Sequence, residues 1–402
     1  MPTEGASGSA ALSESRRRSI LRLMTVTLFV VAGAIHYQTP MLGALALEFG
    51  VTAPGWVASC TFGGFLVGML FVVPLGDRHD RRKLILWHYL GLILALLAAA
   101  LAPNLALLSL ACVGIGLGSS LGQNVVPMTA EYSPAENRAR TLGTVLMGMF
   151  FGILFARLTG GLIAASLGWR WSFVLAAVLC LLLAPALWRI LPASTPRTRM
   201  PYWSLIGSLF GILAQYAELR RVAANQFFIG ISYGGFWSTV APMLLAFHAL
   251  GPSEAGLMAI PGAAGVLISR AAGRWSDRSG ASIVATAALC SVLLSFSVLE
   301  LAAHWLLAVV LGAMLLDFGL RAAMVANQTL VNSIQPDARS RFNTIFGLAV
   351  WSGNATGAAL ASLAFREWGW GAVCALSLSA SVIALLLQWL DHRRRVAANP
   401  VT

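Results

Sequence analysis

Long apolar segments alternate with short polar ones along nearly the whole chain. Each apolar segment holds about 20 residues, which is the length of helix that crosses the hydrocarbon core of a bilayer. The pattern predicts two sets of six spans. They are expected at Ile20–Leu45, Trp56–Leu75, Leu84–Ala102, Leu105–Ala130, Leu142–Leu167, Trp171–Leu191, Phe227–Phe247, Ala255–Ala272, Ser282–Leu299, Trp305–Val325, Phe342–Phe365 and Trp370–Leu390.

Between the two sets, Pro192, Pro196 and Pro201 interrupt the helical pattern and predict a linker. Tyr202–Leu219 carries apolar residues at helical spacing but is short and polar at its ends, so an interfacial helix is expected there. The alternative, a further span, would move Arg-rich loops of the second half outside, against the positive-inside rule. The expected domains are a disordered cytoplasmic tail (1–19), a six-helix bundle (20–191), a cytoplasmic linker (192–222), a second six-helix bundle (223–391) and a basic cytoplasmic tail (392–402).

Composition supports an all-α integral membrane protein. Hydrophobic residues make up 58% of the 402 residues and charged residues 10%, with a mean hydropathy of +0.78. The net charge of +12 could suggest a nucleic-acid partner, but 26 of the 27 cationic residues are Arg scattered among short loops. The positive-inside rule explains them and places both termini in the cytoplasm. The five cysteines lie in apolar segments without metal-type spacing, so no metal or cofactor is expected.

One polar loop is unusually dense in charge. Val73–Lys83, with the sequence VPLGDRHDRRK, follows one predicted span and precedes the next. A weaker copy, Gly273–Gly280, again places Asp-Arg directly after an apolar segment. Other positions repeat at an offset of 201 (339 − 138): Arg138 and Arg140 with Arg339 and Arg341, Gly152 with Gly353, and Trp169 with Trp370. The repeats predict a duplication of six spans, with a substrate route between the halves.

The two charged loops resemble the loop between the second and third helices of the major facilitator superfamily. The resemblance implies twelve helices in two six-helix bundles related by pseudo-two-fold symmetry. It also implies a cytoplasmic gating motif at Asp77, Arg78, Arg81, Arg82, Asp277 and Arg278. The first copy departs from the family pattern, with Val73 and Asp80 where glycines are expected. Gly148–Gly152 resembles the glycine-rich fifth helix of the family's antiporters, although Ile153 stands where that motif has Pro.

A few ionisable residues lie inside predicted spans, where each is costly unless it is paired or faces water. Asp317 and Arg321 are four residues apart on one helix face and could simply neutralise each other. Alternatively, Asp317 accepts protons in a central cavity, with Arg157 or Arg321 tuning it. His36 could titrate near neutral pH, although a lone His in a span more often serves as a neutral hydrogen-bonding group. The drug/proton antiporters' usual first-helix acid and fourth-helix Arg are missing here.

Amide and aromatic side chains in the central helices suit a cavity for an amphiphilic organic molecule. The candidates were chosen by helix and depth: Tyr37, Gln38, Gln123, Asn124, Tyr233, Trp237, Asn327, Gln328, Trp351 and Asn354. Without a phosphate-binding loop in the sequence, ATP is not expected to drive transport. Asp317, Asn327–Thr329 and Pro336–Arg341 in the second half resemble bacterial members of the drug and metabolite efflux branch of the family. The resemblance implies a non-enzymatic, monomeric transporter in a bacterial inner membrane that exports a drug or metabolite in exchange for protons. The alternatives are a proton-coupled uptake symporter and a membrane sensor without transport activity.

Overall fold

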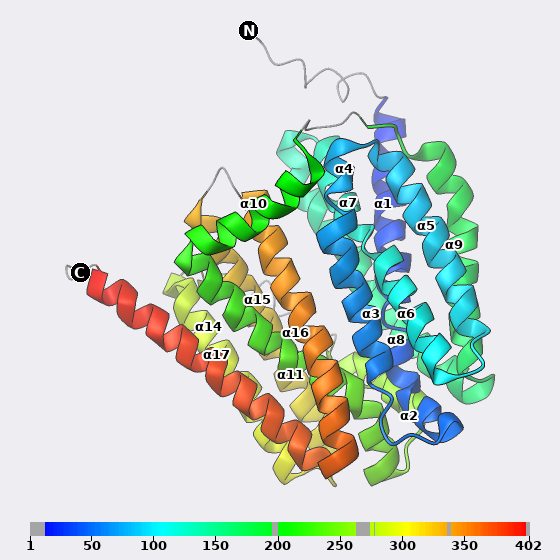
Figure 1. The fold of residues 1–402 in the computed structure, drawn as a ribbon, viewed down its shortest axis with the longest axis vertical. Coiled ribbons are helices and arrows are strands. Elements are labelled where there is room, and N and C mark those ends of the chain that lie inside the picture. Colours follow the sequence, from blue (N-terminus) through cyan, green and yellow to red (C-terminus); the bar gives the residue numbers. More distant parts are fainter. Residues whose placement is uncertain (1–12, 195–199, 263–273, 277, 336–338, 399–402) are drawn as a thin grey trace.

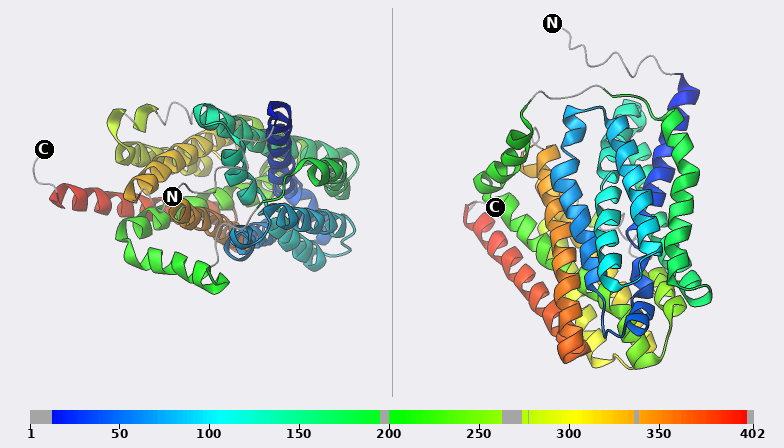
Figure 2. Two further views of the ribbon diagram at one scale, coloured as in Figure 1. Left: turned by 90° about the horizontal axis from the view of Figure 1, so that it is seen from above. Right: turned by 45° about the vertical axis from the view of Figure 1, so that its right-hand side comes forward.

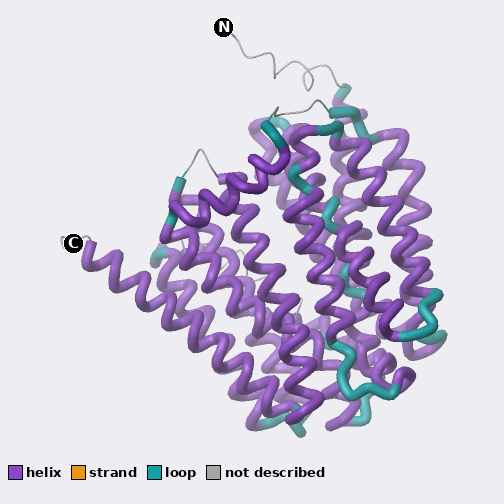
Figure 3. The backbone as a smooth tube through the Cα atoms, in the orientation of Figure 1, coloured by secondary structure: helices purple, strands orange, loops and turns teal. Residues whose placement is uncertain are grey.

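The computed structural model describes residues 13–194, 200–262, 274–276, 278–335 and 339–398 (Figure 1). These residues form helices joined by short loops, and no strand occurs among them (Figure 3). Apolar helices of this kind satisfy their own backbone hydrogen bonds, as a lipid environment requires. The predicted all-helical membrane fold is therefore confirmed.

The first half contains the helices that precede residue 192. They are α1 (Glu14–Ala34), α2 (Gln38–Phe49), α3 (Trp56–Val67), the π-helical turn η2 (Gly68–Val72), α4 (Leu75–Arg78), α5 (Arg81–Ala100), α6 (Leu105–Ser119), α7 (Gly122–Tyr132), the 3₁₀ turn η3 (Ala135–Asn137), α8 (Arg138–Ser166) and α9 (Trp169–Ile190). Three of the predicted spans of this half are interrupted, and the second passes from α3 into the π-helical turn η2. The first is divided into α1 and α2 around His36, and the fourth into α6 and α7.

The second half follows the linker helix α10 (Tyr202–Gln215). Its helices are α11 (Ala217–His248), α12 (Pro252–Leu257), α14 (Ala281–Leu301), α15 (Leu306–Ile334), α16 (Arg339–Trp368) and α17 (Trp370–Ala398). Seen from above, the two halves lie side by side (Figure 2). Most of the predicted span Ala255–Ala272 lies outside the described residues. Within the described ranges, eleven helical segments are long and apolar enough to cross a membrane.

Two predicted domain boundaries differ from the helix bounds. Residues 14–19, expected in the disordered tail, form the first turns of α1, because Ser13 caps the helix by accepting the backbone N–H of Arg16 at 3.4 Å. Residues 217–222, expected in the linker, belong to α11. A 14-residue helix, α10, lies where an interfacial helix was expected and ends at Gln215.

The duplication seen in the sequence recurs in the packing. Gly168 and Gly369, again 201 apart (369 − 168), both take a positive φ in the turns that join α8 to α9 and α16 to α17. A Cβ on Gly152 would lie 2.0 Å from the carbonyl oxygen of Phe29, and one on Gly353 would lie 2.2 Å from that of Phe227. Helix α8 therefore crosses α1 as α16 crosses α11, with backbones in contact at a glycine.

The halves meet at the end of the molecule opposite the described N-terminus. The hydroxyl of Ser362 in α16 accepts the backbone N–H of Gly55 at 3.0 Å and donates to Ala53 O at 2.5 Å. Nearby, Ser59 Oγ donates to Ala355 O at 2.7 Å. These bonds join α16 to α3 and to the loop before it. We call Ala53, Gly55, Ser59, Ala355 and Ser362 the seam.

A second contact between the halves joins α8 to α12 at the same end. A Cβ on Gly161 would lie 2.3 Å from Pro252 O, so the two backbones touch. Helix α12 is fixed at its start by Glu254, which accepts hydrogen bonds from Ser253 Oγ at 2.8 Å and from Gly251 N at 3.0 Å. The Ser253 hydroxyl and the backbone N–H groups hold the pKa of the Glu254 carboxyl below its usual value. This end of the interface is therefore closed.

Candidate functional site

Arg157 reaches from α8 across the interface into the second half. Its guanidinium lies 3.6 Å above the ring of Trp237, and its Nη2 donates to Tyr233 Oη at 3.2 Å. Both partners are on α11. The residue is only 4% exposed and Trp237 only 2%. A fully charged side chain is therefore buried against an aromatic face, which attracts cations through its quadrupole.

Arg321 makes the reciprocal contact from the second half. Its guanidinium lies 4.7 Å above the ring of Phe150 on α8. Its Nη2 is 3.9 Å from Asp317 Oδ1, one turn earlier on α15, which is the long limit of an ion pair. Each half thus contributes one Arg that rests on an aromatic ring of the other.

Asp317 lies at the centre of this arrangement and is 1% exposed. Neither of its carboxylate oxygens has a hydrogen-bond donor among the described residues. A Cβ on Gly262 would lie 2.8 Å from Asp317 Oδ2 and 3.4 Å from Trp237 Cζ2, so the carboxylate and the indole border the same glycine. Both Arg157 and Arg321 are within electrostatic range of the carboxylate. We call Phe150, Arg157, Tyr233, Trp237, Asp317 and Arg321 the central cluster.

The break between α1 and α2 lies beside this cluster. His36 is buried there, its Nδ1 is 2.9 Å from Ala32 O, and Arg157 and Arg321 are within electrostatic range of its ring. Gln38 is fully buried, and neither its amide oxygen nor its amide nitrogen has a partner among the described residues. Tyr37 instead packs inside the first half, because a Cβ on Gly160 would lie 3.1 Å from its Cδ1.

Trp351 joins α16 to α3. Its ring centroid lies 4.1 Å from that of Phe65 and 5.8 Å from that of Phe62. Asn354, one turn later, is buried where α16 touches α11, since a Cβ on Gly234 would lie 2.2 Å from its carbonyl oxygen. Trp351 therefore lies at the interface between the halves, and Asn354 lies at a helix crossing within the second half.

Asn327 and Gln328, two of the predicted cavity residues, bond to side chains outside the central cluster. Asn327 is fully buried inside the second half, where its Nδ2 donates to Asn225 Oδ1 at 3.0 Å and to Gln226 Oε1 at 3.1 Å. Gln328 is exposed and donates to Asn343 Oδ1 at 3.2 Å. Both amides donate hydrogen bonds to side chains of neighbouring helices. Depth in a span alone therefore does not show whether an amide faces a cavity. Gln123, on α7, is half-buried.

Asn124 belongs to the charged loop rather than to a cavity. It is buried, and a Cβ on Gly76 would lie 2.4 Å from its Oδ1. The loop itself is built around Arg81, which is 4% exposed. Arg81 Nη2 is 2.7 Å from Asp77 Oδ1, its Nη1 is 3.6 Å from Glu131 Oε2 on α7, and its Nε donates to Gly76 O. A buried guanidinium thus lies between two carboxylates from different helices.

Asp80 fastens the same loop to the linker. Its Oδ1 caps α5 by accepting Arg82 N at 2.9 Å and also accepts Ser194 N at 2.9 Å. Arg82 donates from its side chain to Trp188 O, whereas Arg78 is half-buried without a described ion pair. Of the predicted second copy, Asp277 lies outside the described residues and Arg278 is exposed. Asp80, which breaks the family's glycine pattern, therefore has a structural function.

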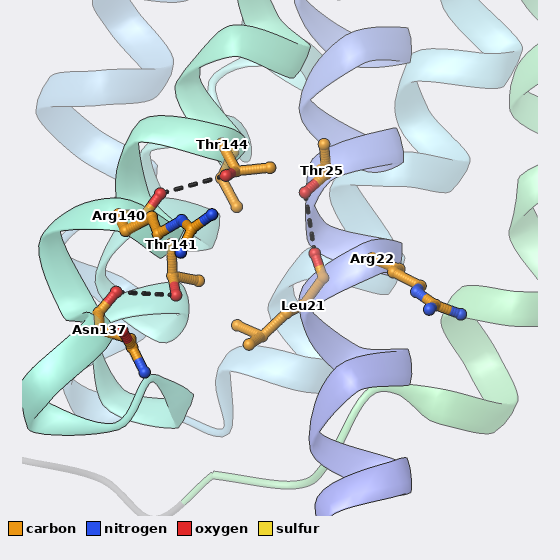
Figure 4. A pocket seen from close by; sticks show the side chains of 8 residues that line it. Leu21, Arg22, Thr25, Asn137, Arg140, Thr141 and Thr144 are labelled. Atoms are coloured by element: carbon orange, nitrogen blue, oxygen red, sulfur yellow. Dashed lines mark hydrogen bonds between the residues drawn. The ribbon is translucent and has the colours of Figure 1, made fainter.

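Two pockets lie on the surface, away from the central cluster. One, of about 340 Å³, separates α1 from the start of α8 (Figure 4). Its hydroxyls on Thr25, Thr141 and Thr144 donate to carbonyls of their own helices. The other, of about 790 Å³, is an apolar groove between α5 and α9 with Lys83 and Arg189 among its lining residues.

Several residues of the site were not predicted from the sequence. Glu131 and Ser194 complete the charged loop, Phe150 belongs to the central cluster and Gly262 borders it, and Ser59 and Ser362 belong to the seam. Glu131 gave a usable signal, since it is an acid at the end of an apolar span. The others are common residue types in apolar segments, and only their contacts distinguish them.

The chain belongs to the Major Facilitator Superfamily, whose model matches residues 24–217 and 222–402. It is 32% identical over 385 residues to "Uncharacterized transporter YgaY" of Escherichia coli O157:H7, covering 95% of this chain and 98% of that protein. It is 24% identical over 347 residues to "Probable sugar efflux transporter" of Helicobacter pylori (strain G27), covering 85% of this chain and 84% of that protein.

The fold also matches solved structures of transporters. A bacterial homologue of the human lysosomal transporter Spinster, in an inward-facing and occupied conformation, superimposes with a TM-score of 0.75 at 16% identity. The match covers 95% of this chain and 98% of that one. The protein is therefore a multi-pass membrane transporter of small molecules with the fold of this superfamily, and not an enzyme.

Proposed function

We propose that the protein exports a small amphiphilic organic compound in exchange for protons. The observation that carries this proposal is Asp317, a buried carboxylate beside arginines from both halves. A carboxylate inside a membrane span costs free energy, so such residues are rare and usually functional, and proton relays are a common function. Moving the halves apart removes the Arg157 charge from Asp317, which changes the affinity of the carboxylate for protons.

The transport cycle follows from where the halves touch. The seam and the contact between α8 and α12 close one end of the interface. The positive-inside rule assigns the opposite end, with the charged loop and the linker, to the cytoplasm, so both termini are cytoplasmic. Rocking of the halves would expose the central cluster to each side in turn. The bacterial relative supports a bacterial inner membrane as the location. We propose that the protein works as a monomer.

The charged loop is proposed as the cytoplasmic latch. Arg81 holds α4 to α7 through Asp77 and Glu131, while Asp80 ties the loop to the linker. Movement of the linker would therefore reach the ends of α4, α5 and α7 together. The alternative is that these charges only determine the orientation of the spans in the membrane. That alternative accounts for exposed Arg residues but not for a buried guanidinium between two acids.

The direction of transport has two candidates. Export is supported by the resemblance of the second half to the efflux branch and by the sugar efflux name of the Helicobacter pylori relative. Uptake by symport is supported by Arg157, a buried cation that forms no ion pair with a described carboxylate. Such a site favours an anion, and a bound anion and an ionised Asp317 repel each other, so a proton would accompany the anion.

The test uses proteoliposomes that contain a pH-sensitive dye and are challenged with a panel of amphiphilic compounds. Wild type is compared with Asp317→Asn and with Glu367→Gln, an exposed acid that pairs with Arg366 away from the cluster. We expect substrate-evoked proton flux in wild type and Glu367→Gln and none in Asp317→Asn. Compound movement without protons in wild type would reject proton coupling. A protein without flux of any compound would indicate the membrane-sensor alternative.

A further inference from the structure

Arg157 is a buried charge that forms no ion pair with a described carboxylate. The ion pair recorded at the centre joins Asp317 to Arg321, and no described carboxylate oxygen lies within 4.0 Å of Arg157. Residues 263–273, which the structure does not describe, contain neither Asp nor Glu in the sequence. Arg keeps its charge in proteins, so this charge cannot be avoided by losing a proton.

The two partners of Arg157 satisfy the guanidinium only in part. Tyr233 accepts one hydrogen bond and Trp237 offers a ring face, but both groups are neutral. The Nε of Arg157 is buried and has no acceptor in the part of the chain that the structure describes. A guanidinium has five N–H donors in a fork that matches the two oxygens of a carboxylate or phosphate. The donor set therefore has unused capacity of the kind that binds an oxyanion.

Both partners also lie on the other half of the protein. Arg157 is on α8 in the first half, while Tyr233 and Trp237 are on α11 in the second. When the halves separate at this level, Arg157 loses the hydrogen bond and the ring together. An anion that binds Arg157 in their place would stabilise the state in which the halves are apart at this level.

We propose that the substrate carries a carboxylate, phosphate or sulfonate that binds Arg157, with its apolar body against Trp237. This inference rests on the proposed function in one respect, namely that the central cluster is the transport site. The alternative is that Arg157 serves only as a distant countercharge for Asp317. In that case the substrate has no need of negative charge, and neutral and anionic compounds would bind alike.

The experiment compares compounds that share one ring and differ in charge. Naphthalene-1-acetate is tested beside its amide, naphthalene-1-acetamide, and beside 2-(naphthalen-1-yl)ethylamine, with naphthyl phosphate and naphthalene sulfonate as further anions. Binding is read as the concentration-dependent rise in melting temperature of the purified protein in neutral detergent. The proteins are wild type, Arg157→Gln, Arg157→Lys and, as the matched control, Arg189→Gln on the surface of α9.

We expect at least one anion to stabilise wild type and Arg189→Gln, with little effect from the amide or the amine. Loss of a charge-assisted hydrogen bond should weaken the apparent affinity of that anion about 10- to 100-fold in Arg157→Gln. Arg157→Lys keeps the charge without the fork and should show an intermediate loss. If Arg157→Gln does not fold, the comparison of Arg157→Lys with wild type serves the same purpose.

Three results would overturn the inference. The first is equal stabilisation by the amide, the second is an anion response that survives unchanged in both Arg157 variants, and the third is a panel in which no anion acts better than its neutral partner. These results are independent of the proposed function. An anion that binds but is never moved in proteoliposomes would reject transport and keep the anion site. Proton-coupled movement of a neutral or cationic compound would keep transport and reject the anion site.

Discussion

The hydroxyl of Ser362 accepts the backbone N–H of Gly55 at 3.0 Å and so joins the last turns of α16 to the start of α3. The bond lies in the closed end of the interface, where it must break if that end opens. Ser362→Ala removes this bond together with the one to Ala53 O. A net loss of about 1 kcal/mol corresponds to a roughly five-fold shift toward the state open at this end.

The shift can be measured with spin labels on Leu47 and Leu301, which are exposed on opposite halves at that end. In a cysteine-free background, the distance distribution between the labels should gain a longer component in Ser362→Ala. Ser166→Ala is the matched control, because the hydroxyl of Ser166 donates within its own helix to Leu162 O. An unchanged distribution in Ser362→Ala would mean that the seam does not contribute to closure.

Arg81→Ala removes the guanidinium between Asp77 and Glu131. Breaking a buried ion pair by deleting one partner costs roughly 3 kcal/mol, at the lower end of the usual range here because water reaches both carboxylates. The melting temperature should therefore fall by several degrees. Arg78→Ala, the adjacent cation without a described ion pair, should leave it within about one degree of wild type. Equal melting temperatures for both variants would show that the loop is held together by other contacts.

Asp77→Asn separates gating from stability. Asp77 is half exposed and its partner Arg81 keeps Glu131, so the variant should fold with little loss of stability. If the loop is the cytoplasmic latch, the rate of transport should nevertheless fall, because the equilibrium between the two conformations changes. The measurement is initial flux in proteoliposomes at matched protein content. Wild-type flux in Asp77→Asn would contradict a gating role.

Asn327→Ala should lower stability and spare the substrate site. The amide of Asn327 donates to Asn225 and Gln226, and Asn225 in turn donates to Ala384 O at 2.8 Å. Leaving buried amides without a partner costs about 1–3 kcal/mol. Unfolding should therefore begin at a lower temperature, while the KM of the protein that remains folded should match wild type. An increased KM at normal stability would indicate that Asn327 lines the substrate cavity.

The sign of proton linkage distinguishes export from uptake. An anion bound at Arg157 adds negative charge near Asp317, whose charged neighbours among the described residues are Arg321 and Arg157. Because two negative charges disfavour each other, co-transport of the anion with a proton predicts that the protein takes up protons when naphthalene-1-acetate binds in weak buffer, whereas the proposed exchange predicts proton release. The signal should vanish in Asp317→Asn. Proton uptake by the protein on binding would favour the symporter, whereas proton release on binding would favour exchange.

The helices could be predicted from the sequence because apolar length is a direct consequence of bilayer thickness. The duplication was also visible, since Arg, Gly and Trp recur at a fixed offset. The central cluster was only partly visible. Asp317, Arg321 and Arg157 were identifiable because an ionisable residue in a membrane span costs free energy. Their partners Phe150 and Gly262 are ordinary residues of apolar helices. Asn327 and Asn124 contact other helices and the charged loop, respectively. Depth in a span does not say which neighbour an amide faces.

The two halves have diverged unevenly since the duplication that their packing records. The position in the first half equivalent to Asp317 is Gly116 (317 − 116 = 201), where a Cβ would lie 1.9 Å from Thr61 O. No side chain fits there unless α3 and α6 move apart. The packing of the first half therefore excludes an acidic residue at this position. Gly152 and Gly353 keep the same helix crossing in both halves, whereas Arg157, Asp317 and Arg321 have no charged counterpart at the offset of 201. An ancestral pair of identical halves could not have carried this charge arrangement.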